Sequence, residues 1–228
     1  MNYNNTIDFT KLLPESWLKI IDPEILNRCN DDINQEIVKC KEENKEIYPY
    51  NVNDIFKIFN LCDIQDIKVV ILGMDPYHSD KNQANGIAFS VNKDVKIPPS
   101  LRNIFKEMGC HNKKDGDLEY LVRRGVFLLN TFLTVKQKTP GSHKFWKDFS
   151  DHIIKLILEN NQDAVFILFG KFAQDTVKIS SNIDSRIFCT SHPSPLSAYK
   201  PCGKFPAFIG SNIFKIVTDK TGILFNKM

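Results

Sequence analysis

The sequence lacks the cysteine spacing of a zinc ribbon or an iron–sulfur protein. None of its six cysteines belongs to a C-x-x-C pair: Cys29, Cys40, Cys62, Cys110, Cys189 and Cys202. A chain of 228 residues can bury a core of its own and does not need disulfide bonds to fold. The cysteine pattern therefore favours a reducing compartment, and we expect no metal and no cofactor.

Long apolar runs and a strong net charge are also missing. No apolar run approaches the length of about 20 residues that spans a bilayer. The first ten residues are polar and do not resemble a secretory signal, so we expect a soluble intracellular protein, cytoplasmic, or nuclear if the source is eukaryotic or viral. Thirty basic residues against 27 acidic ones give a net charge of +3. Because that charge is small, binding to nucleic acid would need a local basic patch.

Four continuous apolar runs indicate strands that are covered on both faces: Ile67–Leu72, Val126–Leu129, Ala164–Phe169 and Arg186–Thr190. Helical patterns lie between these runs, at 101–108, 118–124, 143–158 and 171–179. Ser100 and Asp117 are expected to cap the first two helices. Alternating strands and helices predict one α/β domain over residues 1–228, with a central parallel sheet and helices on both faces. We expect the four strands of that sheet in the spatial order 2-1-3-4. Residues 1–60 are expected to form a mainly helical segment packed on it.

Chemically suggestive residues follow each predicted strand. The first strand leads into Gly73-Met74-Asp75-Pro76-Tyr77-His78, the second ends at Asn130, the third at Gly170-Lys171, and the fourth at Ser191-His192. Ligands of open α/β sheets bind at the carboxyl ends of the strands. The sequence therefore predicts one site at that rim.

These strand-end residues belong to segments that, together with other segments of the chain, resemble motifs of the family 1 uracil-DNA glycosylases. Gly73–His78 matches the family's water-activating motif, with Met74 in place of glutamine, and Lys171 stands where the family usually has serine. The matches follow the family's order from about Trp17 to Lys215. The other matching segments are the uracil-stacking stretch Gln83–Val91, the proline-rich loop Pro98–Leu101, the base-reading strand end Leu128–Asn130 with Leu133–Val135, and the DNA-inserting loop His192–Ser197.

The resemblance implies an enzyme that hydrolyses the N-glycosidic bond of uracil in single- or double-stranded DNA and so begins base-excision repair. The nucleotide must be flipped into a pocket, since its reacting atoms are inaccessible inside a duplex. A monomer without a cofactor is expected. The DNA-mimic inhibitor proteins that target this family are expected as further partners.

The resemblance also assigns roles around the reacting base. Asp75 would orient water and stabilise the positive charge on the sugar, and His192 would donate a hydrogen bond to uracil O2. Asn130 would pair with the Watson–Crick edge of uracil, Tyr77 would exclude the methyl group of thymine, and the ring of Phe89 would stack on the base. The backbone N–H of residue 74 would face the pocket, although methionine loses any polar side-chain contact there. The alternative is structural: a turn for Asp75, a backbone hydrogen bond for His192, a cap at a strand end or turn for Asn130, and a core position for Phe89.

A second group of residues would contact DNA. Leu196 would enter the gap that the flipped base leaves. Small side chains and backbone N–H groups would hold phosphates, and Lys171 would strengthen salt-sensitive binding. Lys200 and Lys204 fit either this role or a solvated surface. The phosphate-binding set comprises Pro98, Pro99, Ser100, Gly170, Lys171, Ser194 and Ser197.

Two other functions stay open at this point. One is a catalytically weak DNA-binding or polymerase-accessory protein on the same fold, against which the intact Asp75, Asn130 and His192 argue. The other is a metal-dependent hydrolase that uses Asp75, His78 and His192, although the sequence has no recognised metal-ligand spacing there. His78 would organise water or phosphate near Asp75, and His143 has a structural role in the simplest interpretation.

Overall fold

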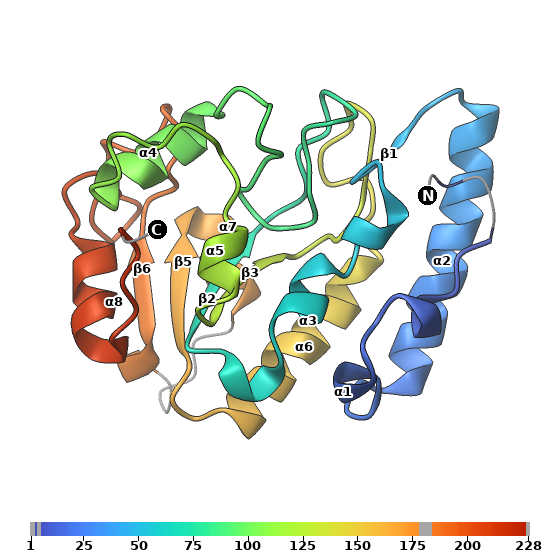
Figure 1. Ribbon diagram of the computed structural model, residues 1–228, viewed down its shortest axis with the longest axis horizontal. Helices are drawn as coiled ribbons and strands as arrows, with labels where there is room; N and C mark the ends of the chain where they lie inside the picture. Colours follow the sequence, from blue (N-terminus) through green and yellow to red (C-terminus); the bar gives the residue numbers. More distant parts are fainter. Residues whose placement is uncertain (1–2, 4–5, 178–183, 227–228) are drawn as a thin grey trace.

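A parallel sheet of four strands lies at the centre of the computed structural model, which describes Tyr3, residues 6–177 and residues 184–226 (Figure 1). Its strands are β2 (Val69–Gly73), β3 (Val126–Asn130), β5 (Val165–Phe169) and β6 (Ile187–Thr190), in the spatial order β3-β2-β5-β6. Numbered along the chain, this is the predicted order 2-1-3-4. The α/β class and the strand order are therefore confirmed.

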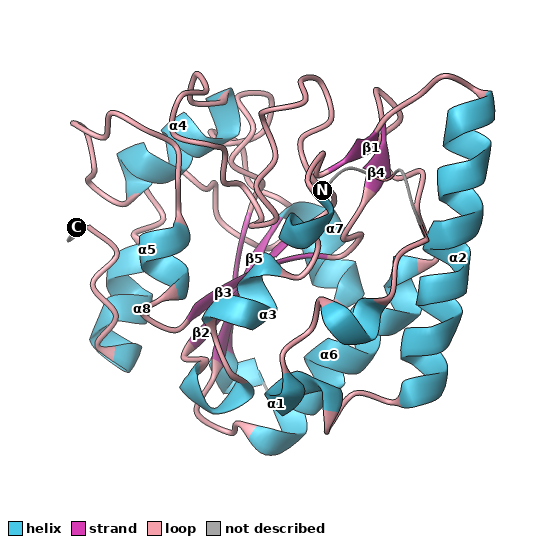
Figure 2. Cartoon of the chain, turned by 45° about the vertical axis from the view of Figure 1, so that its right-hand side comes forward, coloured by secondary structure: helices cyan, strands magenta, loops and turns pink. Residues whose placement is uncertain are grey.

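Helices cover both faces of this sheet (Figures 1 and 2). On one face lie α3 (Lys57–Leu61) and α6 (Trp146–Asn160), and on the other lie α5 (Glu119–Val122) and α8 (Ile213–Thr221). The long helix α2 (Pro23–Glu42) packs on the outer side of α6. The other helices and strands are α1 (Glu15–Leu18), α4 (Pro99–Glu107), α7 (Gly170–Thr176) and the antiparallel pair β1 (Ile47–Tyr48) and β4 (Val135–Lys136). Short 3-10 turns occupy Phe9–Lys11, Val52–Asp54, Ile64–Asp66 and Asp184–Arg186.

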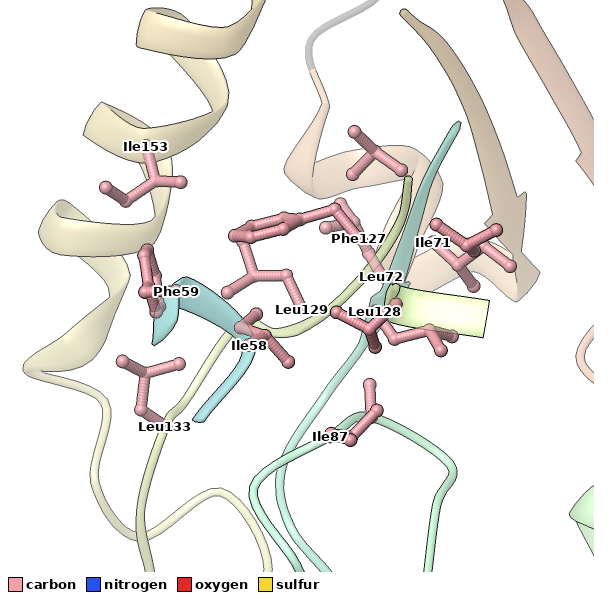
Figure 3. Close-up of a cluster of buried hydrophobic side chains, with 14 of the residues drawn as sticks. Ile58, Phe59, Ile71, Leu72, Ile87, Phe127, Leu128, Leu129, Leu133 and Ile153 are labelled. Carbon is pink, nitrogen blue, oxygen red and sulfur yellow. The ribbon is translucent and has the colours of Figure 1, made fainter. Parts of the chain in front are cut away.

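Apolar side chains on both faces of the sheet form the core. All residues of β2, β3 and β5 are buried, which explains their unbroken hydrophobic runs. Figure 3 shows Phe59 of α3 and Ile153 of α6 on the same side as Phe127 of β3. The Phe59 and Phe127 rings meet edge to face at 5.3 Å. This packing holds the strand ends that carry the polar residues.

Several predicted boundaries shift. The strand β2 begins at Val69 rather than Ile67, because Ile64–Asp66 forms a 3-10 turn before it. Ser100 does not cap α4, so that prediction is wrong: proline at the first position already fixes a helical φ, and the helix begins at Pro99. The Asp117 side chain does accept the Glu119 N–H at the start of α5. Helix α6 begins at Trp146 rather than His143, and positions 178–179 of the fourth predicted helix lie outside the described residues.

One short feature, the pairing of β1 with β4, was not predicted. It involves two residues on each strand, which is too short to produce a periodic pattern. Within the described part of the chain, no helix combines the length and apolar character needed to cross a membrane.

Candidate active site

The carboxyl ends of the four strands surround one cavity of about 420 Å³. Gly73 and Asn130 pair at the ends of β2 and β3, and Phe169 pairs with Thr190 at the ends of β5 and β6. Most of the residues assigned to the base and the reaction line this cavity: Met74, Asp75, Tyr77, Phe89, Asn130 and His192, together with Ser100 and His78. The structure therefore brings the early turn and the late loop of the sequence to one pocket.

Asp75 is held at the cavity by a backbone donor. Its Oδ2 accepts the N–H of Gly141 at 2.7 Å, although Gly141 is far away in the sequence. Burial raises the pKa of this carboxyl above its ordinary value, and the Gly141 bond and the proximity of His78 act in the opposite direction. Asp75 is thus a partly desolvated carboxyl group in a fixed position, and its ionised form could stabilise a nearby cation.

The imidazole of His192 is fixed in one tautomer. The N–H of Ser194 donates to Nδ1 at 3.1 Å, so Nδ1 is the acceptor and the ring proton is on Nε2. Burial lowers the pKa of His192, which favours the neutral ring. His192 is therefore a neutral hydrogen-bond donor through Nε2–H.

A glycine allows His192 to come this close to the sheet. Gly170 has φ +74°, and a Cβ at this position would lie 2.9 Å from the Cβ of His192. A residue with a side chain would therefore have to push the loop away. The close approach of backbone and imidazole explains Gly170 better than a phosphate contact does, because the residue is buried.

Asn130 offers an acceptor that nothing in the described protein uses. Its side chain is 5% exposed, and Oδ1 has no hydrogen-bond partner among the described residues. The neighbouring Gly73 is required for this placement, since a Cβ there would lie 2.3 Å from Asn130 Oδ1. A buried, unpaired amide oxygen costs free energy until a donor arrives. The N3–H of a bound uracil is a donor of the right kind.

Tyr77 and Phe89 provide the aromatic part of the cavity wall. Burial raises the pKa of the Tyr77 hydroxyl, which stays neutral. Phe89 has φ +63°, an unfavourable backbone conformation outside glycine. Its loop is fixed by the N–H of Ala88, which donates to Leu128 O of β3 at 3.0 Å. Phe89 also contacts the His192 ring, with centroids 6.0 Å apart. Such a strained, anchored aromatic residue next to a cavity is typical of a binding site.

The segment after His192 forms a braced loop with an apolar tip. The Leu196 side chain is 87% exposed. Ser197 Oγ donates to His192 O at 3.1 Å, and the N–H of Ala198 donates to Ser194 O at 2.8 Å. The loop is therefore held by its own hydrogen bonds while it presents Leu196 to solvent. Because the loop backbone is already held, insertion of Leu196 between bases would not require that backbone to become ordered.

The other proposed DNA-contacting residues lie around the cavity with different exposures. Pro99 is exposed and Ser100 is half-buried at the start of α4, whereas Pro98 is buried. Lys171 is exposed at the start of α7, where its Nζ lies 3.3 Å from Asp175 Oδ2. Such an exposed pair within one helix is weak, so the ammonium group can exchange the carboxylate for a phosphate.

A model of the uracil DNA glycosylase superfamily matches residues 59–211 of the chain. The chain belongs to the uracil DNA glycosylase superfamily. The glycosylase is 42% identical to the uracil-DNA glycosylase of Borreliella burgdorferi over 218 residues, which covers 91% of this chain and 92% of the relative. It is 40% identical to the uracil-DNA glycosylase of Bacillus cytotoxicus over 213 residues, which covers 88% of this chain and 93% of the relative.

Solved structures agree with the assignment of the chain to this superfamily. The crystal structure of mimivirus uracil-DNA glycosylase matches with a TM-score of 0.79 and 25% identity, over 97% of this chain and 88% of that chain. The structure of a mimivirus UNG variant in complex with UGI matches with a TM-score of 0.80 and 25% identity, over 94% of this chain and 87% of that chain.

Sequence reasoning missed three contributors to the site of the glycosylase. Gly141 carries no side chain and holds Asp75 only through its backbone. Asn103 of α4 donates to Pro193 O at 2.8 Å and so fixes the loop from a distant segment. Phe172 also lines the cavity, with 39% of its surface exposed. An aromatic residue directly after Gly170-Lys171 was the one signal that the sequence offered for Phe172.

Two other histidines that the sequence singled out, His78 and His143, have different positions. His78 lines the cavity, and its buried Nδ1 has no hydrogen-bond partner among the described residues. His143 is buried outside the cavity, and burial lowers its pKa to about 4. Within the described residues, the one set of three potential metal ligands whose donor atoms gather within 4.8 Å contains His143 and does not include Asp75, His78 or His192. The geometry thus gives the metal-dependent alternative no support.

Proposed function

We propose that the chain follows the family 1 mechanism, with the residues around the 420 Å³ cavity in the roles that the sequence assigns them. As a member of its superfamily the chain is a uracil-DNA glycosylase, a hydrolase that removes uracil from DNA and initiates base-excision repair. The observation that carries the proposed mechanism is the juxtaposition of a fixed carboxylate and a neutral imidazole at one pocket. The Gly141 N–H holds the Asp75 carboxylate in place, and the Ser194 N–H holds the His192 imidazole with its proton on Nε2.

Two opposite charges develop when the glycosidic bond breaks. The sugar becomes similar to an oxocarbenium ion and uracil leaves as an anion. The Asp75 carboxylate stabilises the sugar cation and orients the attacking water. His192 Nε2–H donates a hydrogen bond to O2 of uracil as negative charge accumulates there. Losing one such preorganised donor typically lowers the rate by roughly 10²–10³.

Recognition of the base depends on Asn130, Tyr77 and Phe89. Asn130 accepts from N3–H and donates to O4, and cytosine presents the inverse pattern on that edge. Tyr77 occupies the space near C5 and excludes a methyl group. Phe89 stacks on the flipped ring, and Leu196 fills the vacated space in the duplex.

We also propose the partners and the location that follow from this activity. The enzyme binds uracil-containing DNA, single- or double-stranded, as a monomer, and a DNA-mimic inhibitor such as UGI competes for the same face. The enzyme works inside the cell, in the cytoplasm, or in the nucleus if its source is eukaryotic or viral. A gel-filtration measurement and a UGI inhibition assay test the first two statements.

The decisive experiment for the mechanism is single-turnover release of uracil from a labelled oligonucleotide, read out by alkali cleavage of the abasic site. We expect wild type to cleave and the double variant Asp75→Asn, His192→Leu to be inactive while still binding DNA. DNA binding without turnover by the wild type would instead indicate an accessory protein. Full cleavage by the double variant would remove both residues from the mechanism.

A further inference from the structure

A second cluster of reactive side chains lies away from the cavity. Glu36 and Cys40 are four residues apart on α2 and therefore share one face of that helix. His143 comes from the segment between β4 and α6. One donor atom from each of the three residues lies within 4.8 Å of the other two. Cys40 and His143 are buried, and Glu36 is half-buried.

The imidazole of His143 has one nitrogen bound and one unpaired. Its Nδ1 lies 2.8 Å from the Thr134 hydroxyl, which also accepts the indole N–H of Trp146 at 2.7 Å. Nε2 is buried, has no hydrogen-bond partner among the described residues, and lies 3.9 Å from Glu36 Oε2. His143 is only 1% exposed, so solvent does not readily satisfy this nitrogen. An imidazole with one nitrogen oriented by a hydroxyl and the other unpaired, beside a carboxylate and in one cluster with a thiol, has the arrangement of a metal ligand.

We propose that Glu36, Cys40 and His143 bind a divalent transition-metal ion of the Zn²⁺ type. Sulfur, imidazole nitrogen and carboxylate oxygen are the three donor types that Zn²⁺ uses, and a water molecule would complete four-coordination. Binding deprotonates the Cys40 thiol, and the proton leaves to solvent. The donor atoms must draw together, because bonds of about 2.0–2.3 Å place ligands closer than they lie now. Glu36 is the least buried of the three residues, so its side chain would make most of that movement.

Two lysines compete with the ion for Glu36. Lys39 Nζ lies 2.7 Å from Glu36 Oε1, and Lys136 Nζ lies 3.8 Å from Oε2 and 3.1 Å from Glu43 Oε2. The contact between Lys136 and Glu36 is the longer of the two that Glu36 makes with lysines, so the ion has to displace Lys136 from Glu36. Replacing Lys136 with methionine removes a positive charge from the site and tightens metal binding.

The site would link α2 to the segment that supports the catalytic carboxyl. Gly141, two residues before His143, holds Asp75 through its backbone N–H. A bound ion fastens this segment to the outer helix and stabilises the folded state by mass action. At a free Zn²⁺ concentration of about 100 times Kd, the expected rise in Tm is roughly 5–10 °C.

The test uses the full chain after treatment with a chelator. Co²⁺ is titrated into wild type, Cys40→Ala, Glu36→Gln, Lys136→Met and the control Cys29→Ala, whose cysteine is buried on the same helix but lies outside the cluster. Thiolate-to-cobalt absorption reports binding, Zn²⁺ displaces Co²⁺, and Tm is measured with and without Zn²⁺. Circular dichroism and uracil release show that each variant is folded.

We expect one Co²⁺ per chain with a thiolate band in wild type and Cys29→Ala. The band should disappear in Cys40→Ala, binding should weaken at least about tenfold in Glu36→Gln, and it should tighten in Lys136→Met. Absence of the band in wild type, or an equal band in Cys40→Ala, would overturn the proposal. If Cys40→Ala does not fold, undiminished binding by Glu36→Gln would overturn it in the same way.

Discussion

Gly73 controls the position of Asn130, and Gly73→Ala should therefore impair recognition of the base. A Cβ at residue 73 would lie 2.3 Å from Asn130 Oδ1 and 3.0 Å from the Cβ of the buried Ala88. Ordinary van der Waals contact begins at 3.4 Å, so the amide oxygen has to retreat by about 1.1 Å (3.4 minus 2.3). A misplacement of about 1 Å can cost roughly 10²-fold in rate, or about 2.7 kcal/mol.

The assay is single-turnover release of uracil from a saturating concentration of single-stranded oligonucleotide. Saturation removes differences in DNA affinity, so the rate reports the position of the base in the pocket. A rate within about threefold of wild type, in a variant that melts normally, would refute the reasoning that Asn130 must keep its present position.

Gly222→Ala provides the matched control. Gly222 follows α8 with φ +74°, and a Cβ there would meet nothing within 4 Å. Its substitution costs about 1–2 kcal/mol of stability through backbone strain and leaves the cavity untouched. We expect a lower Tm and an unchanged rate, which separates loss of stability from loss of recognition.

Four further outcomes follow from the cavity. Because burial raises the pKa of Asp75 and lowers that of His192, the single-turnover rate should rise with pH as Asp75 ionises and His192 becomes neutral, and then stay level near neutral pH. A fall in the rate toward neutral pH that vanishes in His192→Asn would show that the charged imidazole is the active form. Tyr77→Ala should release thymine from a T:G oligonucleotide measurably above wild type; no release would show that Tyr77 does not exclude the methyl group. Lys171→Ser should reduce the slope of log K against log salt by about 1 in a DNA-binding titration, and an unchanged slope would remove Lys171 from the interface. Met74→Gln should change the rate only modestly, and inactivity would contradict the backbone role of residue 74.

The predictable part of the fold depends on long, uniform patterns. The apolar runs of β2, β3 and β5 predicted the sheet because strands covered on both faces have no polar positions to interrupt them. The run at Arg186–Thr190 also predicted a strand, but the expectation that both its faces are covered is not met, since three of the four residues of β6 are only half-buried. The cap at Ser100 failed because Pro98-Pro99 provides a helix start of its own, which outweighs a weak hydroxyl preference. The β1–β4 pair left no trace in the sequence because two residues per strand have no period.

The site was predictable to a similar extent. The sequence indicated Asp75, Asn130 and His192 because each follows a predicted strand, and strand ends of a parallel sheet meet at one rim. Gly141 could not be inferred, since its contribution is a backbone N–H brought to Asp75 by folding. Neither could Asn103, whose amide reaches the carbonyl of Pro193 from another element.

By itself, the sequence determined the α/β class, the superfamily and the main residues that meet at the pocket, because local periodicity and ordered motifs are properties of the chain. Only the tertiary structure decided the tautomer of His192, the unpaired oxygen of Asn130 and the close approaches at Gly73 and Gly170. Those properties depend on distances of a few ångströms between segments far apart in the chain. Packing sets these distances, and no local pattern records them.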